Sequence, residues 1–425
     1  LYENIKLNYN VFTAGDFKSG PEPYTRDSMS ENDKIAWNAF AEPMWEKMTS
    51  MMETGRKLPK GTIQNYGDNA HVLFTENPET AEVALNLGLV DKVVTREEIR
   101  NYMFEQFPNE EDDMYAFPDS ISIYDYLDTI EADASESSNK IAVVNIEGAI
   151  MTGEAAYGIA GSDTIVKNIQ SATKDEDIKA MVLRVNSPGG DVWASELITN
   201  ALKEFKDSGR PVVTSMGDVA ASGGVWVTTN SDEIWAEENT LTGSIGVYGI
   251  IPTMDGLYDW AGISVDGVSS TKAGEWDERE AMPDYVKNII QSNIDNIYKK
   301  FVTKVAENRD MAYVDVLPIA GGRIWSGVKA LELGLVDKMG DLEDALSSAA
   351  DMADIEDYSV KTYRKELDPL DAFLQEVLEN IDYQVKVDPS IKILLDKTSK
   401  YSKIISLEDE SIMAYCFECD AIENL

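Results

Sequence analysis

One serine lies among small residues, where a short hydrophobic run gives way to a turn. The run Val212-Val213-Thr214 is typical of a buried strand, which we expect to break at Met216-Gly217. The small residues Ala220-Ala221-Ser222-Gly223-Gly224 follow and predict a tight turn into a helix. A serine at such a turn can expose its hydroxyl as a nucleophile, although the usual G-x-S-x-G signature is absent. Ser222 is therefore a candidate nucleophile, and a plain helix N-cap is the alternative.

A serine nucleophile needs a base, and histidine is scarce in this chain. The single histidine, His71, follows Gly-Asp-Asn-Ala. No turn of the kind that could expose a nucleophile lies near it, and we interpret it as a surface-loop residue. A lysine amine can act as the base if its pKa falls from its usual ~10.4 toward neutrality. Burial against apolar surface can supply such a shift. The sequence therefore favours a lysine in this role.

Acyl transfer also needs donors for the negative charge that develops on the carbonyl oxygen. The segment Asn186-Ser187-Pro188-Gly189-Gly190 follows a predicted strand, and a predicted helix begins at Val192. Glycines let backbone N–H groups approach a substrate oxygen, and a helix start adds positive potential. An oxyanion hole and an ordinary strand-to-helix turn both remain open for this segment.

Composition limits the classes of function. The chain has 425 residues, 43% of them hydrophobic, and a net charge of −40. That length suits two packed domains. Such an acidic surface repels phosphate backbones, so we expect no nucleic-acid partner. The two cysteines, Cys416 and Cys419, are weak evidence for a metal site because a second pair is absent.

Strands alternate with helices through the middle of the chain, which indicates βαβ units and a mostly parallel sheet. We therefore expect an α/β fold. The predicted strands cover residues 9–12, 141–146, 180–185 and 212–214, and the predicted helices residues 31–52, 81–87, 163–172, 192–205 and 283–306.

An internal repeat indicates two homologous domains. Residues 84–92, ALNLGLVDK, match residues 330–338, ALELGLVDK. We assign residues 1–130 to the C-terminal part of a first repeat, 131–140 to a polar linker, and 141–365 to a second repeat. Residues 366–425 form an acidic tail of unassigned role. We also expect the front of the first repeat, with any targeting or anchor segment, to lie before Leu1.

Four separated motifs resemble those of the signal peptide peptidase A (protease IV) family, the serine–lysine peptidases of family S49, in its long two-domain form. Three of them, residues 184–190, 220–224 and 241–246, stand in the family's order and spacing. The fourth, residues 15–23, resembles the loop that carries the catalytic lysine, and residues 26–30 continue the match. The resemblance runs from near Leu1 to about residue 365 and implies a Clp-protease-like (crotonase-like) fold in two tandem domains.

The resemblance also implies roles for individual residues. Ser222 would be the nucleophile and Lys18 the general base, the lysine coming from the first domain and the serine from the second. Gly189 and Gly190 would frame the oxyanion hole, and Ser244 would orient the lysine amine. No cofactor and no metal are implied.

Lys272 is the alternative base. It lies in the region of the second domain that corresponds to the lysine loop of the first, and single-domain relatives take their lysine from the serine's own domain. An ungapped comparison of the two loops places Gly274, not Lys272, opposite Lys18. We therefore interpret Lys272 as a rim residue.

The activity implied is serine endopeptidase action on cleaved signal peptides and other unfolded or membrane-derived peptides. The resemblance further implies a homotetramer, attached to the bacterial cytoplasmic membrane through a segment outside this chain, with its catalytic domains on the periplasmic side. Two other functions remain open on the same fold: a crotonase-type acyl-CoA enzyme, and an inactive scaffold in which Ser222 only caps a helix.

Overall fold

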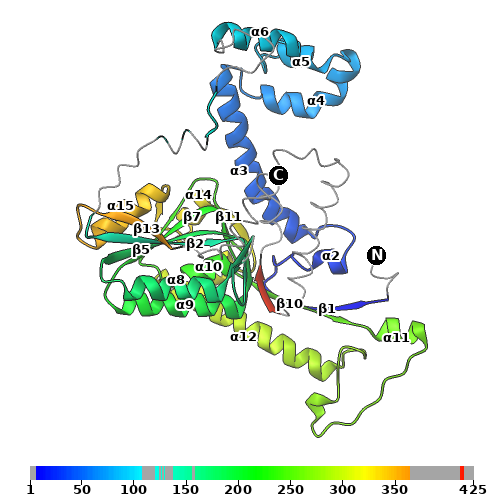
Figure 1. Cartoon of the computed structure of the whole chain (residues 1–425). Coiled ribbons are helices and arrows are strands. Elements are labelled where there is room, and N and C mark those ends of the chain that lie inside the picture. The colour runs from blue at the N-terminus through cyan, green and yellow to red at the C-terminus, as the bar shows by residue number, and fades with distance from the viewer. Residues whose placement is uncertain are drawn as a thin grey trace. The chain divides into compact units, whose positions relative to one another are not determined.

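The structure, a computed structural model, describes residues 6–107, 120–123, 126, 129, 137–155, 158–363 and 412–415 (Figure 1). The chain forms two compact units. One comprises Leu1–Phe40 together with Glu136–Leu425, and the other comprises Ala41–Ser135. This division is based on contacts in space and not on sequence similarity between segments. The two homologous repeats therefore stay a prediction.

A mostly parallel sheet forms the centre of the larger unit. Its strands run in the order β11-β9-β7-β5-β2-β13, with β8 and β12 as a branch beside β7. All neighbours in it are parallel except β11 and β9. The bounds are β2 Lys140–Glu147, β5 Ile178–Ser187, β7 Val212–Ala221, β8 Glu233–Ala236, β9 Leu241–Gly243, β11 Ile324–Ser326, β12 Lys338–Met339 and β13 Ser359–Tyr363.

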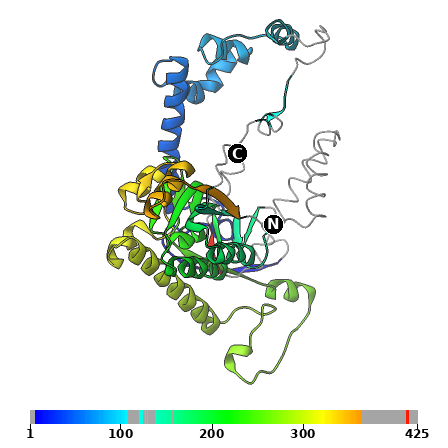
Figure 2. The ribbon, with the colours of Figure 1, turned by 60° about the vertical axis from the view of Figure 1, so that its left-hand side comes forward.

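Helices cover both faces of this sheet, which explains why its strands read as continuous hydrophobic runs. Alternate residues of β2 point to opposite faces. Ile141 and Val143 pack with Ala345 of α15 (Leu342–Met352). Val144 packs in the larger core on the other face, with Ile169 of α8 (Ser162–Lys174) and Leu202 of α9 (Val192–Asp207). Figures 1 and 2 show α15 on one side of the sheet and α8 and α9 on the other.

A second sheet of six strands lies in the same unit, in the order β1-β10-β14-β6-β3-β4. Its bounds are β1 Asn8–Ala14, β3 Ala149–Met151, β4 Ile159–Gly161, β6 Gly189–Asp191, β10 Val247–Thr253 and β14 Ile412–Tyr415. Its strands β1 and β10 are far apart in the sequence but pair over their full lengths, from Asn8 opposite Thr253 to Ala14 opposite Val247. This pairing brings the start of the chain beside residues that follow Ser222.

The remaining helices of the larger unit include a long one, α12 (Asp284–Asn308), and five short ones. The short helices are α2 (Glu22–Thr25), α10 (Gly223–Thr228), α11 (Asp255–Ala261), α13 (Tyr313–Val316) and α14 (Gly327–Glu332).

The helix α3 (Glu31–Arg56) begins in the larger unit and ends in the smaller one, which also holds α4 (Thr62–Glu76), α5 (Thr80–Asn86) and α6 (Arg96–Gln106). Within the smaller unit, Glu53 of α3 is buried, and its carboxylate accepts hydrogen bonds from the N–H groups of Gly61 (3.0 Å) and Ile63 (3.0 Å). A carboxylate at a helix start is stabilised by the free N–H groups there, so Glu53 fixes the start of α4.

Most predicted elements are confirmed with small shifts of their ends, and Ser30 caps α3 through a hydrogen bond from Asp33 N–H (3.0 Å). Two predictions are wrong. The strand at Val212 continues past Met216-Gly217 to Ala221, although its pairing with β5 shifts register just after Met216 and its pairing with β9 begins only at Val219. His71 lies in α4, exposed, and not in a loop. The helices expected at residues 371–380 and 391–395, and Cys416 and Cys419, lie outside the described residues.

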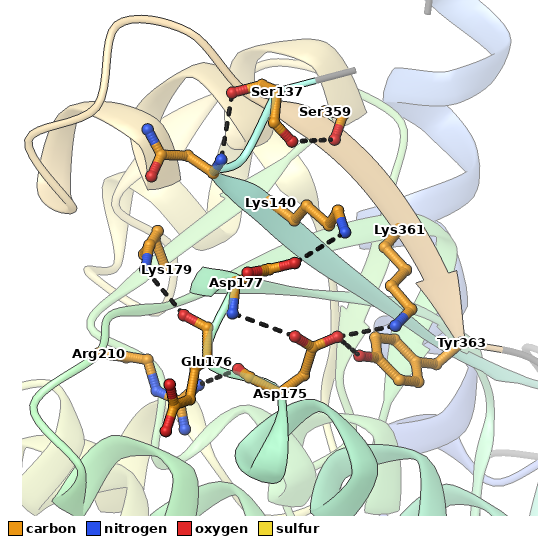
Figure 3. Close-up of polar contacts among 11 residues, drawn as sticks. Ser137, Lys140, Asp175, Glu176, Asp177, Lys179, Arg210, Ser359, Lys361 and Tyr363 are labelled. Carbon is orange, nitrogen blue, oxygen red and sulfur yellow. Dashed lines mark hydrogen bonds and ion pairs between the residues drawn. The ribbon is translucent and has the colours of Figure 1, made fainter.

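Polar contacts fix one edge of the parallel sheet, around the turn between α8 and β5 (Figure 3). Asp175 accepts hydrogen bonds from Lys361 Nζ (2.7 Å) and Tyr363 Oη (3.3 Å), both on β13. The hydrogen bond from Lys361 holds the pKa of the Asp175 carboxyl below its usual value. Arg210 donates to the carbonyls of Thr173 (2.7 Å) and Asp175 (3.2 Å), so it satisfies carbonyl groups that the end of α8 leaves free.

A second polar cluster connects α10, which follows Ser222, to α9 and α12. Glu196 Oε1 of α9 accepts a hydrogen bond from Lys300 Nζ (2.8 Å), and Oε2 accepts one from Trp226 Nε1 (3.0 Å) and lies 3.2 Å from Lys304 Nζ. The Trp226 ring also packs on Phe301, with ring centroids 4.7 Å apart. Burial alone would raise the pKa of Glu196, but these hydrogen bonds and charges outweigh it and lower the pKa.

We expect Glu196→Gln to lower the free energy of unfolding by about 1–3 kcal/mol at neutral pH, because it leaves two cations facing a neutral amide. A carboxyl whose pKa is lowered by folding stabilises the fold above its unfolded pKa, and that stabilisation is lost as the pH falls through the folded pKa. The difference between variant and parent should therefore shrink in acid. Denaturant unfolding at several pH values measures it. Asp207→Asn is the control, because the Asp207 pair with Lys203 is exposed on the same helix.

Candidate active site

Ser222 lies at the junction between β7 and α10 in an uncommon backbone conformation, with φ 55° and ψ −112°. A residue other than glycine adopts positive φ at a cost of about 1–3 kcal/mol, so surrounding contacts must hold it. One such contact is the hydrogen bond from Ser222 N–H to the Gly243 carbonyl (2.9 Å). Ser222 occupies the N-cap position of α10, but its side chain makes no capping hydrogen bond. The N-cap interpretation of the hydroxyl is therefore wrong.

The hydroxyl of Ser222 instead meets the amine of Lys18. Lys18 Nζ donates hydrogen bonds to Ser222 Oγ (2.9 Å), to Ser244 Oγ (2.9 Å) and to the Ser244 carbonyl (3.3 Å). All three side chains are buried, with exposed fractions of 6% for Lys18, 0% for Ser222 and 2% for Ser244. The ring of the buried Tyr248 lies beside the amine, 5.9 Å from Nζ to the ring centroid. The structure thus brings together three of the predicted site residues.

The pairing of β1 with β10 positions the lysine. Ala14, the last residue of β1, lies opposite Val247, which follows Ser244 by three residues. A turn then delivers Lys18, whose N–H donates to the Gly15 carbonyl (3.2 Å). The lysine therefore reaches the serine through backbone pairing between distant parts of the chain.

A second loop, which sequence reasoning missed, supports the lysine turn. Phe17 N–H donates to the Gly321 carbonyl (2.8 Å), and Gly322 N–H donates to the Ile245 carbonyl (2.9 Å). Gly322 has φ 87°, and a Cβ there would lie 2.6 Å from Lys18 N. The pair Gly321-Gly322 connects the lysine loop to the segment that carries Ser244, and only glycine allows so close an approach. In the sequence, the only signal for this loop was its pair of adjacent glycines, which follow an apolar stretch.

Gly189 and Gly190 form the start of β6, whose residues contact α10. A Cβ on Gly190 would lie 1.9 Å from the Ile150 carbonyl oxygen, so the close approach of β3 requires glycine. Gly189 N–H donates to Ser187 Oγ (3.1 Å), and that hydroxyl donates in turn to the Gly148 carbonyl (2.7 Å). A substrate oxygen would share or replace the Ser187 hydroxyl as the acceptor for Gly189. Sequence reasoning assigned no role to Ser187, whose hydroxyl holds the Gly189 N–H.

Lys272 lies elsewhere. It is exposed in the short 3₁₀ helix Lys272–Gly274, and its amine lies 4.9 Å from the ring centroid of Tyr285. The structure therefore places Lys18, rather than Lys272, in hydrogen-bond contact with Ser222.

Neither a metal site nor a membrane-spanning helix is found among the described residues. No group of three or more His, Cys, Asp or Glu side chains in this part of the chain could hold a metal ion. None of the helices described is both long enough and apolar enough to span a bilayer.

The sequence is similar to known peptidases. A model of peptidase family S49 matches residues 204–356. Protease 4 of Salmonella typhi is 34% identical over 90% of this chain and 61% of its own length, and Protease 4 of Haemophilus influenzae is 29% identical over the whole chain and 70% of its own length. A putative signal peptide peptidase SppA of Enterococcus faecium is 34% identical over 56% of this chain and 70% of its own length.

The mixed α/β fold with its parallel sheet, together with these relatives, fits the Clp-protease-like fold class. More specifically, the chain belongs to peptidase family S49. It spans about two thirds of the length of the two relatives called Protease 4.

Proposed function

We propose that this chain is a serine endopeptidase in which Ser222 is the nucleophile and Lys18 the general base. The observation that carries the proposal is the 2.9 Å contact between Lys18 Nζ and Ser222 Oγ inside the protein. A nucleophile in contact with a base, which a third group orients, is the usual arrangement for covalent catalysis. Ser244 is the orienting group, since its hydroxyl and its carbonyl both accept from the amine.

The reaction proceeds in two stages. A neutral Lys18 amine removes the hydroxyl proton as Ser222 Oγ attacks the peptide carbonyl carbon, and the resulting ammonium gives a proton to the leaving amine. Water, deprotonated by the same amine, then hydrolyses the acyl-enzyme. The backbone at Gly189 and Gly190 stabilises the oxyanion, and Gly223 N–H is a further donor because no helical carbonyl precedes it in α10. Burial in general disfavours the charged form of an amine, which suits this role.

Further parts of the proposal concern the whole protein. Its substrates are cleaved signal peptides and other unfolded peptides, and it acts as a homotetramer of chains built from two tandem repeats. It is held at the bacterial cytoplasmic membrane, on the periplasmic side, through a segment outside this sequence. The resemblance of the four motifs to family S49 is the ground for the substrates and the tetramer, and the similarity to bacterial proteins named Protease 4 supports the association with a membrane.

Covalent labelling tests the central assignment. A fluorophosphonate should react with the folded chain at one serine, and peptide mass spectrometry should place the adduct on Ser222. Ser222→Ala should remove the adduct, and Lys18→Ala should slow its formation strongly. A folded chain without any adduct would favour the inactive scaffold, and turnover of an acyl-CoA thioester without peptide hydrolysis would favour the crotonase-type enzyme.

Ser244→Ala should reduce kcat/KM by about tenfold to a hundredfold, since it removes one hydrogen bond from the catalytic amine, worth about 1.5–3 kcal/mol. The hydroxyl accepts from the amine and so favours its protonated form. Removing the hydroxyl should therefore move the acidic limb of the pH–rate profile to lower pH. A structural role alone would lower stability and leave that limb in place. Steady-state kinetics against pH, beside a denaturation curve, separates the two.

A further inference from the structure

One arginine contacts both of the segments that surround the Lys18 amine. Arg323 lies directly before β11, and its guanidinium carbon Cζ lies over two aromatic rings. It is 4.5 Å from the ring centroid of Phe17, the residue before Lys18, and 4.7 Å from that of Trp325 in β11. A guanidinium over an aromatic ring is attracted by the negative charge of the ring face. The side chain of Arg323 therefore connects the lysine turn to β11.

The main chain of the same arginine contacts the turn that carries Ser244. The Arg323 carbonyl accepts a hydrogen bond from Ser244 N–H (2.6 Å), and beside this contact β9 and β11 pair, with Gly243 opposite Ile324. Ser244 has φ 51°, which a residue other than glycine adopts only where surrounding contacts hold it. Arg323 thus holds both the turn that delivers the amine and the turn that supplies its acceptors.

The guanidinium of Arg323 lies over rings although the chain is rich in carboxylates. The sequence has 77 Asp and Glu residues against 37 Lys and Arg. Yet Arg323 Nε is buried and has no hydrogen-bond partner in the part of the chain that the structure describes. Burial of a donor without a partner disfavours this placement, so the contacts with the two rings have to outweigh it. The position of the guanidinium is therefore determined by Phe17 and Trp325.

We propose that Arg323 is a positioning residue for the general base. Its guanidinium fixes Phe17, and with it the turn of Lys18, so that the amine stays within hydrogen-bond distance of Ser222 Oγ and Ser244 Oγ. This support is needed because the turn belongs to no helix or strand and the lysine stem is flexible. A displacement of about 1 Å at a catalytic group can reduce the rate about 10²-fold. The inference rests on the proposed function for its link to catalysis.

The first test compares kcat with stability in the full chain. Arg323→Ala should lower kcat for a fluorogenic peptide by about tenfold to a hundredfold, because the Lys18 turn loses its contact with β11. The KM should stay at the parent value, since a positioning residue does not contact the substrate. Arg210→Ala is the matched control. Its guanidinium lies 4.3 Å from the ring centroid of Phe205, in the cluster of Figure 3, so its loss should lower the melting temperature and leave kcat unchanged.

A second variant tests whether Arg323 acts through Phe17. Phe17→Leu keeps an apolar side chain but removes the ring, and it should lower kcat by a similar factor. It also tests the same contact if Arg323→Ala does not fold. A chain with both changes should be no slower than the slower single variant, because the two residues act through one contact. Fully additive losses in the logarithm of kcat would overturn the proposal.

A chemical measurement makes the test independent of catalysis. Ser222→Ala chains with and without Arg323→Ala are treated with trace acetic anhydride, and peptide mass spectrometry compares acetylation of Lys18 with that of the exposed Lys272. Lys18 is only 6% exposed, so it should react slowly while Arg323 is present. Arg323→Ala should raise the ratio of Lys18 to Lys272 acetylation by about tenfold, because a turn that opens more often exposes its amine.

An unchanged acetylation ratio would overturn the proposal, as would a kcat of Arg323→Ala that falls no further than that of Arg210→Ala. If no chain hydrolyses peptides but the ratio rises as expected, the proposed function fails and the role of Arg323 in holding the lysine turn stands. If the parent hydrolyses peptides and Arg323→Ala changes neither kcat nor the ratio, the positioning role fails and the proposed function stands.

Discussion

Ser222→Ala and Lys18→Ala should each abolish measurable peptide hydrolysis while the chain stays folded. Each change removes one half of the 2.9 Å contact between the amine and the hydroxyl. Loss of a nucleophile or of its base lowers kcat by about 10⁴-fold or more in enzymes of this kind. Hydrolysis of a fluorogenic peptide by purified variants measures the loss, and circular dichroism checks the fold.

Two comparisons make this result specific. Lys272→Ala should keep the parent rate, because Lys272 is exposed and contacts Tyr285 instead of the serine. The double variant Ser222→Ala with Lys18→Ala should be no slower than either single variant, since residues that act as a unit are not additive. An active Lys18→Ala chain, together with an inactive Lys272→Ala chain, would contradict the assignment of the base.

Gly190→Ala should have the second large effect, on both activity and stability. The added Cβ would lie 1.9 Å from the Ile150 carbonyl oxygen, which is backbone and cannot move aside as a side chain does. The strands β3 and β6 would have to separate there, and the candidate oxyanion donors would shift with β6. We expect kcat/KM to fall by at least about 10²–10³, the usual effect of losing an oxyanion donor, with a lower melting temperature.

Gly267→Ala is the matched control for this prediction. Nothing lies within 4 Å of a Cβ at Gly267, so the same chemical change should alter neither rate nor melting temperature there. A Gly190→Ala chain with the parent rate would show that the backbone at this position takes no part in the reaction.

Much of the parallel sheet could be predicted from the sequence, because its signals are local. The buried strands around Val144 and Val182 read as continuous apolar runs, and the alternating helices imply parallel pairing. The turn at Ser222 was also visible, since small residues on both sides of a serine leave few conformations. The predicted break at Met216-Gly217 was wrong because the strand absorbs an irregularity there: its pairing with β5 shifts register after Met216, and pairing with β9 takes over from Val219.

The assembly of the site could not be derived from local signals. Lys18 and Ser222 are 204 residues apart, and only the match of the lysine loop to family S49 connected them. The pairing of β1 with β10 that brings them together depends on tertiary contacts. The strand β14 was missed for a similar reason. The run Ile412-Met413-Ala414-Tyr415 is short and stands in an acidic tail, so its partners decide its structure.

The pairing of β1 with β10 also decides when the candidate site can form during synthesis. Lys18 precedes Ser222 by 204 residues, and β10, which ends at Thr253, is made after both. Until that strand is made, β1 lacks the partner that holds the lysine beside the serine. A ribosome-bound chain therefore cannot assemble the proposed Ser–Lys pair until its synthesis has passed β10.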